Sequence, residues 1–168
     1  MFRIELLGSQ HERAAFFCGS DPLDSYFQQK VNQDVRRRIT ACFVAVSKSE
    51  QIAGFYSLAS ASIVLTDLPT AIGKKLPRYP AVPAVRMGRL AVDQNFKGKG
   101  LGAALLADAL ARACNAEIAA FALVVDAKDQ VAATFYAHHG FIAFEAEPMS
   151  LFLPLSVVKA DIQGAFGS

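Results

Sequence analysis

The sequence predicts an α/β fold for this chain of 168 residues. Short apolar segments with strand-like alternation are separated by segments whose apolar residues recur at helical spacing. One of these strands leads through a glycine-rich loop into a helical pattern. Apolar residues make up 53% of the chain and charged residues 19%, so we expect a packed core and not a disordered chain.

The N-terminal third is expected to form three strands and one helix. Residues 2–7 alternate as a strand does, and Asp21 can cap a helix that begins at Pro22. Residues 41–46 and 52–59 are two further strands, which a polar turn joins into a hairpin.

The middle of the chain combines an irregular segment with the glycine-rich loop. Residues 66–83 hold four of the seven prolines and predict an excursion, with a short helix near Ala71. A strand over residues 85–92 then precedes the loop, and a helix over 102–114 follows it.

The remaining elements alternate in the same way. Residues 121–125 form an apolar, β-branched strand that we expect to be buried on both faces. A helix over 128–138 ends at Gly140, and residues 141–144 and 151–153 complete the sheet.

Composition favours one domain over residues 1–160, with a flexible tail over 161–168. Neither a membrane-spanning run nor a signal-peptide pattern is expected, which favours the cytoplasm. The cysteines and histidines lack the spacing of a disulfide framework or a metal site, so no metal is expected; they are Cys18, Cys42, Cys114, His11, His138 and His139.

The glycine-rich loop, residues 97–102, is the clearest functional signal. Glycines at alternate positions leave backbone N–H groups open at the start of a helix, where the helix dipole is positive. A pyrophosphate is the natural ligand of such a loop. Lys97 and Lys99 add positive charge.

Three phosphate-binding motifs were compared with this loop. The chain holds no Walker string. A dinucleotide fingerprint is formally matched by Gly98, Gly100 and Ala103, but too little chain follows Gly102 for further strand–helix units. The third motif, Arg/Gln-x-x-Gly-x-Gly/Ala, binds coenzyme A in the GNAT acetyltransferases, and it fits with Lys97 in the first place.

The order of motifs resembles the GNAT superfamily, and within it the GNAT toxins of bacterial toxin–antitoxin pairs. The resemblance rests on strings spread over nearly the whole chain: Cys18-Gly19, Leu23-Asp24-Ser25-Tyr26-Phe27, Gly54-Phe55-Tyr56-Ser57-Leu58, Leu76-Pro77-Arg78-Tyr79-Pro80, Arg89-Leu90-Ala91-Val92-Asp93 and Phe135-Tyr136-Ala137-His138-His139-Gly140-Phe141.

This resemblance implies a GNAT fold, in which helices flank a twisted, mixed but mostly antiparallel sheet of about six to seven strands that is splayed at the acetyl-CoA site. It also implies transfer of acetyl from acetyl-CoA to the α-amine of aminoacyl-tRNA, which blocks translation. The implied partners are a ribbon-helix-helix antitoxin and a second copy of the chain, with DNA bound only through the antitoxin complex.

The resemblance assigns Tyr136 as the general acid that protonates the departing thiolate. The expected coenzyme-binding residues are Leu90, Ala91, Val92, Lys97, Gly98, Lys99, Gly100, Leu101, Gly102 and Phe135, of which Phe135 is expected mainly to pack. His138 and His139 are expected at the surface, and no general base is evident.

Clustered cations indicate a polyanionic acceptor, although short charge runs are commonly solvated helix ends. The acceptor-side candidates are Arg36, Arg37, Arg38, Arg78 and Arg89, with Tyr79 and Arg86 beside them; for Arg89 a structural ion pair is an equal alternative. Two other functions remain open at this point: acetylation of a small amine or peptide N-terminus, and a binding module that has lost its chemistry.

Overall fold

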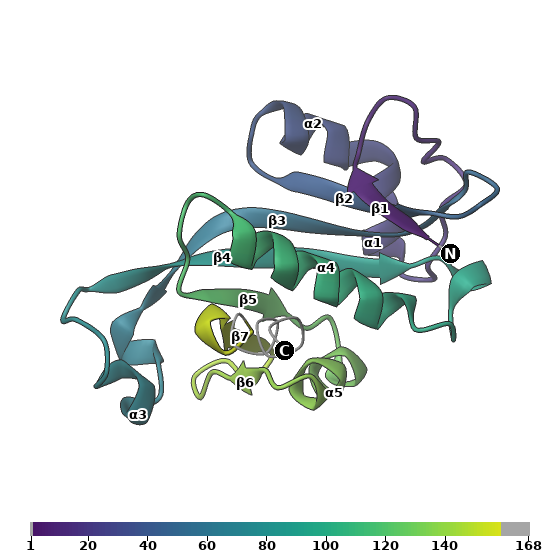
Figure 1. Cartoon of the computed structure of the whole chain (residues 1–168). Coiled ribbons are helices and arrows are strands. Elements are labelled where there is room, and N and C mark those ends of the chain that lie inside the picture. The colour runs from purple at the N-terminus through teal and green to yellow at the C-terminus, as the bar shows by residue number, and fades with distance from the viewer. Residues whose placement is uncertain (1, 159–168) are drawn as a thin grey trace, which may run out of the picture. The chain divides into compact units, whose positions relative to one another are not determined.

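The computed structural model describes residues 2–158, so the tail expected over 161–168 lies outside the described residues. Seven strands form one sheet in the order β1-β2-β3-β4-β5-β7-β6 (Figure 1). Helices occur between the strands in chain order. The α/β class expected from the sequence is confirmed.

The chain divides into two compact units, which are described separately. Among the described residues, unit 1 comprises 2–59 and 87–109, and unit 2 comprises 60–86 and 110–158. Two long strands, β3 (Ile52–Val64) and β4 (Ala81–Val92), and one helix, α4 (Leu101–Asn115), contribute residues to both units.

Unit 1 is built on an antiparallel meander. β1 (Arg3–Leu6) pairs with β2 (Ala41–Val46), and β2 pairs with β3, which confirms the expected hairpin. Three phenylalanines form the centre of its core: the rings of Phe27 and Phe55 stack at 4.3 Å, and Phe16 meets both edge-on. These aromatic contacts fix the helical segment of unit 1 against the sheet.

The N-terminal helical segment differs from the expectation at its start. Helix α1 (Asp21–Ser25) already contains Asp21, its N-cap is Ser20, and no side chain caps it. The carboxylate of Asp24 accepts instead from the backbone N–H groups of Cys18 and Gly19, in the segment that precedes the helix. A π-turn, η1 (Tyr26–Lys30), then leads into α2 (Val31–Arg36).

The two long strands extend further than the sequence predicts. β3 continues to Val64 and β4 begins at Ala81, so the expected excursion contracts to residues 65–80. Pro83 lies exposed within β4, and its carbonyl accepts from the Phe121 N–H at 2.8 Å. The excursion holds a short 3-10 turn, η2 (Leu65–Asp67), and the expected short helix, α3 (Thr70–Gly73).

Unit 2 contains the C-terminal strands. β5 (Ala122–Asp126) and β6 (Ile142–Ala143) both pair antiparallel with β7 (Ser150–Pro154). Helix α5 (Gln130–His138) follows β5 and is capped by Asp129, whose carboxylate accepts from the Ala132 N–H at 2.8 Å. The core of unit 2 comprises Ile63, Leu68, Val82, Ala84, Ala122, Val124 and Phe152.

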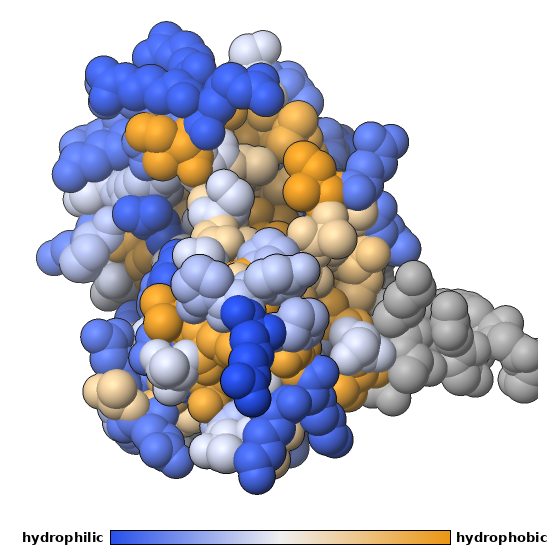
Figure 2. Space-filling model, turned by 90° about the vertical axis from the view of Figure 1, so that its left-hand side faces the viewer, coloured by the Kyte–Doolittle hydropathy of each residue, from blue (hydrophilic) through white to orange (hydrophobic). Residues whose placement is uncertain are grey.

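No helix among residues 2–158 is long and apolar enough to cross a membrane. Figure 2 shows hydrophobic residues that reach the surface as separate patches between hydrophilic ones. The large apolar side chains that are exposed in unit 2 include Val64, Tyr79, Ile118 and Val131.

Candidate active site

The glycine-rich loop of unit 1 has the backbone conformation that a phosphate-binding loop requires. Gly98 and Gly100 have φ angles of +78° and +77°, which L side chains rarely adopt. A Cβ atom placed on either glycine would meet nothing within 4 Å, so the loop borders open space. Helix α4 begins directly after it at Leu101. These features fit the pyrophosphate of a coenzyme at the N-terminus of α4.

Asp93 organises the entrance to this loop, a role that the motif comparison did not assign. Its buried carboxylate accepts from the backbone N–H groups of Phe17 at 3.0 Å and Asn95 at 2.9 Å. Its own N–H donates to the carbonyl of Ala53 at 2.8 Å. The helix-capping role of Asp93 was readable from the aspartate before Gln94-Asn95-Phe96. Its contact with Phe17 was not, because it joins distant parts of the sequence.

The two lysines of the loop have different surroundings. The Lys97 ammonium donates to the backbone carbonyl of Cys18 at 2.7 Å. The Lys99 ammonium lies 5.6 Å from the centre of the Phe96 ring, and both lysines are exposed. Lys97 therefore fastens the loop to a distant segment as well as charging it, whereas Lys99 contacts the nearby Phe96 ring and adds charge.

The strand before the loop ends in the three expected coenzyme-contacting residues. Leu90, Ala91 and Val92 are the last residues of β4, and Ala91 is buried while its neighbours are half-buried. The Arg89 guanidinium lies 3.4 Å from the centre of the Tyr26 ring. This cation–π contact gives Arg89 a structural role in unit 1.

Tyr136 lies on α5 in unit 2 and is buried, with 5% of its surface exposed. Its ring packs against those of Phe141 and Phe135, with centroids 5.6 and 5.3 Å away. Burial, followed by the negative charge of Asp126, raises the pKa of Tyr136 to about 12. The phenol is therefore protonated throughout the neutral range, as a proton or hydrogen-bond donor must be.

The neighbours of Tyr136 follow the sequence expectation. His138 and His139 are both exposed, at the end of α5. Phe135 is half-buried, and its ring lies 4.8 Å from that of His139. No group of three potential metal ligands occurs within residues 2–158.

Four of the expected acceptor-side cations are exposed, whereas Arg86 and Arg89 are half-buried, and the candidates belong to different units. Arg36, Arg37 and Arg38 close α2 in unit 1, and Arg38 has a positive φ of 60°. Arg78 follows α3 in unit 2. Arg86, in the part of β4 that belongs to unit 2, is half-buried and donates to the carboxylate of Asp126.

The fold, the glycine-rich loop of unit 1 and the buried Tyr136 of unit 2 together indicate the class of protein, and the comparison with family models agrees. A family model described as an acetyltransferase (GNAT) domain matches residues 18–150. The chain belongs to this family and is an acetyl-CoA-dependent N-acetyltransferase.

Particular relatives narrow this class. A tRNA-acetylating toxin of Mycobacterium tuberculosis is 32% identical over 148 residues, which cover 87% of each chain. A probable toxin TacT of Sinorhizobium fredii is 28% identical over 162 residues, 90% of each chain.

Solved structures of toxins share the fold over nearly the whole chain. AtaT complexed with acetyl-methionyl-tRNAfMet superimposes with a TM-score of 0.89 at 27% identity and covers 96% of this chain and 99% of its own. AtaTR bound with AcCoA gives a TM-score of 0.82 at 28% identity, covering 96% and 98%. An AtaT variant bound to the C-terminus of the antitoxin AtaR gives 0.80 at 25% identity, covering 95% and 96%.

Proposed function

We propose that this protein is a toxin that transfers acetyl from acetyl-CoA to the α-amino group of an aminoacyl-tRNA and thereby blocks translation. The observation that carries the proposal is the 32% identity, over 87% of both chains, to a tRNA-acetylating toxin. The structural similarity to AtaT in complex with acetyl-methionyl-tRNAfMet supports the same acceptor class.

On the coenzyme side, we assign pyrophosphate binding to the backbone N–H groups of residues 98–102. Their support is the open glycine backbone and the N-terminus of α4. Leu90, Ala91 and Val92 are assigned to the pantetheine arm, with Lys97 and Lys99 supplying charge. One ammonium hydrogen of Lys97 is used in the bond to the Cys18 carbonyl, so the remaining hydrogens are those that can bind the phosphates.

On the chemical side, we assign Tyr136 to the leaving group. The acceptor amine attacks the thioester carbonyl, a C–N bond forms, the C–S bond breaks and the coenzyme leaves as a thiolate. A thiol has an ordinary pKa of about 8.5. Because the pKa of Tyr136 is well above this value, its phenol stabilises the thiolate chiefly by donating a hydrogen bond.

The proposal needs no strong general base. The α-amine of an aminoacyl ester is less basic than a lysine side chain, so much of it is already neutral near pH 7. Water or a backbone carbonyl can accept the proton that the amine releases on attack.

The exposed cations Arg36, Arg37, Arg38 and Arg78 suit the phosphates of a tRNA. Such contacts position an RNA and carry no sequence information. The cation–π contact of Arg89 with Tyr26 favours a structural role for Arg89 over a direct RNA contact.

As partners we propose an antitoxin of the ribbon-helix-helix class, a second copy of the chain, and DNA only through the antitoxin complex. The complex of the similar toxin AtaT with the C-terminus of AtaR supports an antitoxin partner. Charged tRNA as the acceptor implies action in the cytoplasm.

Radiolabelled acetyl-CoA mixed with the protein and total charged tRNA tests the proposal, with deacylated tRNA as the control. We expect label in the charged pool alone, and arrest of cell-free translation that depends on acetyl-CoA. Label in neither pool, from protein that binds acetyl-CoA, would contradict the proposal. Acetylation of simple amines or peptide N-termini under the same conditions would then support the alternative function.

A further inference from the structure

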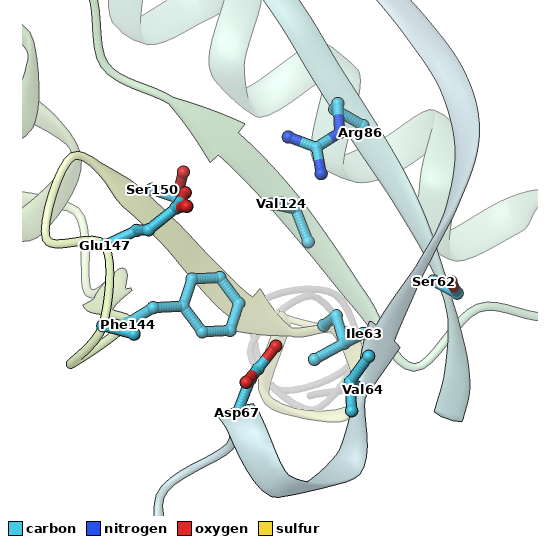
Figure 3. A pocket seen from close by; sticks show the side chains of 10 residues that line it. Ser62, Ile63, Val64, Asp67, Arg86, Val124, Phe144, Glu147 and Ser150 are labelled. Atoms are coloured by element: carbon cyan, nitrogen blue, oxygen red, sulfur yellow. The ribbon is translucent and has the colours of Figure 1, made fainter. Parts of the chain in front are cut away.

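Unit 2 contains a cavity of about 330 Å³ whose lining includes none of the expected coenzyme-binding residues. The side chains of Arg86, Val124 and Phe144 point into it from β4, β5 and the segment after β6 (Figure 3). Asp67 and Glu147 border it as well. Its volume is within the roughly 300–1,000 Å³ of small-ligand sites.

Asp126 connects this cavity with Tyr136. The carboxylate of Asp126 accepts from Ser150 Oγ at 2.8 Å and from Arg86 Nη1 at 2.5 Å, and both donors line the cavity. The charge of the same carboxylate contributes to the raised pKa of Tyr136. The two side chains that donate to Asp126 therefore belong to the cavity wall, and the charge of the same carboxylate disfavours ionisation of Tyr136.

The charges of the cavity oppose an anionic occupant. Asp67 and Glu147 are acidic, and Arg86, the cation among the residues described as lining the cavity, already pairs with Asp126. A phosphate or carboxylate would meet two acidic groups and a neutralised arginine. An amine, neutral or protonated, meets hydrogen-bond acceptors of the right sign.

The rest of the wall is apolar. Ile63 and Val124 are buried members of the core, and Phe144 packs on Phe152 with ring centroids 4.9 Å apart. The cavity therefore combines carboxylates on one part of its lining with a hydrocarbon and aromatic surface on another. An amine with an apolar side chain attached to the neighbouring carbon has the same two parts.

We propose that this cavity is the acceptor subsite that holds the aminoacyl group, with its α-amine toward Glu147 and its side chain against Phe144. The inference rests on the proposed function and adds a specificity: apolar aminoacyl groups are accepted and acidic ones are rejected. Phe144 determines side-chain size, and Glu147 disfavours acidic side chains.

The test uses one tRNA body charged separately with leucine, glycine or aspartate, so that the RNA contacts stay constant. We expect the leucyl form to be acetylated fastest and the aspartyl form slowest. Phe144→Trp, which fills the cavity, lowers kcat/KM for the leucyl form about tenfold or more, and changes the glycyl form much less. Ile118→Trp, at an exposed residue of unit 2 outside the cavity, leaves all three within about twofold.

A second pair of variants tests the charge. Both Glu147 and Glu145 are exposed, but Glu147 lines the cavity and Glu145 does not. Glu147→Gln should raise kcat/KM for the aspartyl form relative to the leucyl form, and Glu145→Gln should leave that ratio unchanged. Acetyl-CoA affinity, measured by calorimetry, should be the same in all of these proteins.

Leucine amide carries the amine and the side chain without the RNA, so its binding separates this inference from the proposed function. Binding to the native protein and its loss in Phe144→Trp would support the cavity even if no charged tRNA were acetylated. No binding of leucine amide, an equal effect of Phe144→Trp on all acceptors, or a loss of acetyl-CoA affinity in that variant would overturn the inference.

Discussion

The ammonium of Lys97 donates a hydrogen bond of 2.7 Å to the backbone carbonyl of Cys18, which lies 79 residues earlier in the chain. Asp93 makes a second connection between the same two regions, through the N–H of Phe17. The start of the glycine-rich loop is thus fastened at two points within unit 1, while Gly98 and Gly100 stay exposed.

The first prediction separates the two loop lysines. Lys97→Met removes a charged donor from a protein carbonyl, so we expect the free energy of unfolding without coenzyme to fall by about 1 kcal/mol. Lys99→Met should stay within about 0.5 kcal/mol, because Lys99 is exposed and its ammonium only approaches the Phe96 ring at 5.6 Å, without a hydrogen bond to a distant carbonyl such as Lys97 makes. Urea denaturation of the apo-protein measures both, and equal stability of the two variants would contradict a fastening role for Lys97.

The second prediction concerns Tyr136. Tyr136→Phe keeps the ring that packs on Phe141 and removes the hydroxyl, so kcat should fall by about a hundredfold or more. The affinity for acetyl-CoA should be unchanged, as judged by calorimetry. Turnover close to that of the native protein would exclude Tyr136 as the group that stabilises the leaving thiolate.

The third prediction follows from the pKa of Tyr136. Folding raises this pKa from 10 to about 12, so above about pH 10 the unfolded chain releases a proton that the native protein retains. Stability is therefore lost as the pH rises past 10, by up to about 1.4 kcal/mol per pH unit from this group. Between pH 8 and about 11, Tyr136→Phe should lose less stability than the native protein. Tyr79→Phe, at an exposed residue, should follow the native protein, and parallel curves for all three would refute the assignment.

The fourth prediction uses the strained backbone of Arg38. A φ of 60° at the end of α2 favours glycine, so Arg38→Gly should raise the free energy of unfolding by roughly 0.5–1 kcal/mol. If Arg38 contacts a tRNA phosphate, the same variant should lower the salt dependence of tRNA binding by about one unit of slope. Arg38→Lys should retain the slope. An unchanged slope in Arg38→Gly would mean that Arg38 is a solvated surface residue that makes no phosphate contact.

The fifth prediction concerns the packing of α4 on the sheet within unit 1. A Cβ atom on Gly54 would lie 2.9 Å from both the Ala91 carbonyl oxygen and Leu105 Cδ1. Gly54→Ala should therefore destabilise the fold by about 1–3 kcal/mol. Gly73→Ala is the control. A Cβ atom on Gly73, in helix α3, would lie 3.7 Å from the Leu65 carbonyl oxygen, which is an ordinary van der Waals distance. A neutral effect of Gly54→Ala in thermal unfolding would contradict this close packing of β4 and α4 against Gly54.

The elements that the sequence predicted well are those whose signal is local. The hairpin of β2 and β3, the helix after the glycine-rich loop and the end of α5 near Gly140 follow from periodicity and turn residues. The excursion was drawn too long, because the prolines of residues 66–83 suggested an interruption that the paired ends of β3 and β4 override. Asp21 was assigned a capping role that the structure gives to no side chain.

The sequence by itself determined the fold class, the open glycine backbone at the start of α4 and the position of Tyr136 on a helix. Each of these depends on residues adjacent in the chain. Only the tertiary structure decided that Lys97 bonds to Cys18, that Arg89 stacks on Tyr26, and that Arg86 and Ser150 meet at Asp126. These contacts join residues far apart in sequence, and a composition or spacing pattern carries no information about which distant partner a charged side chain will meet.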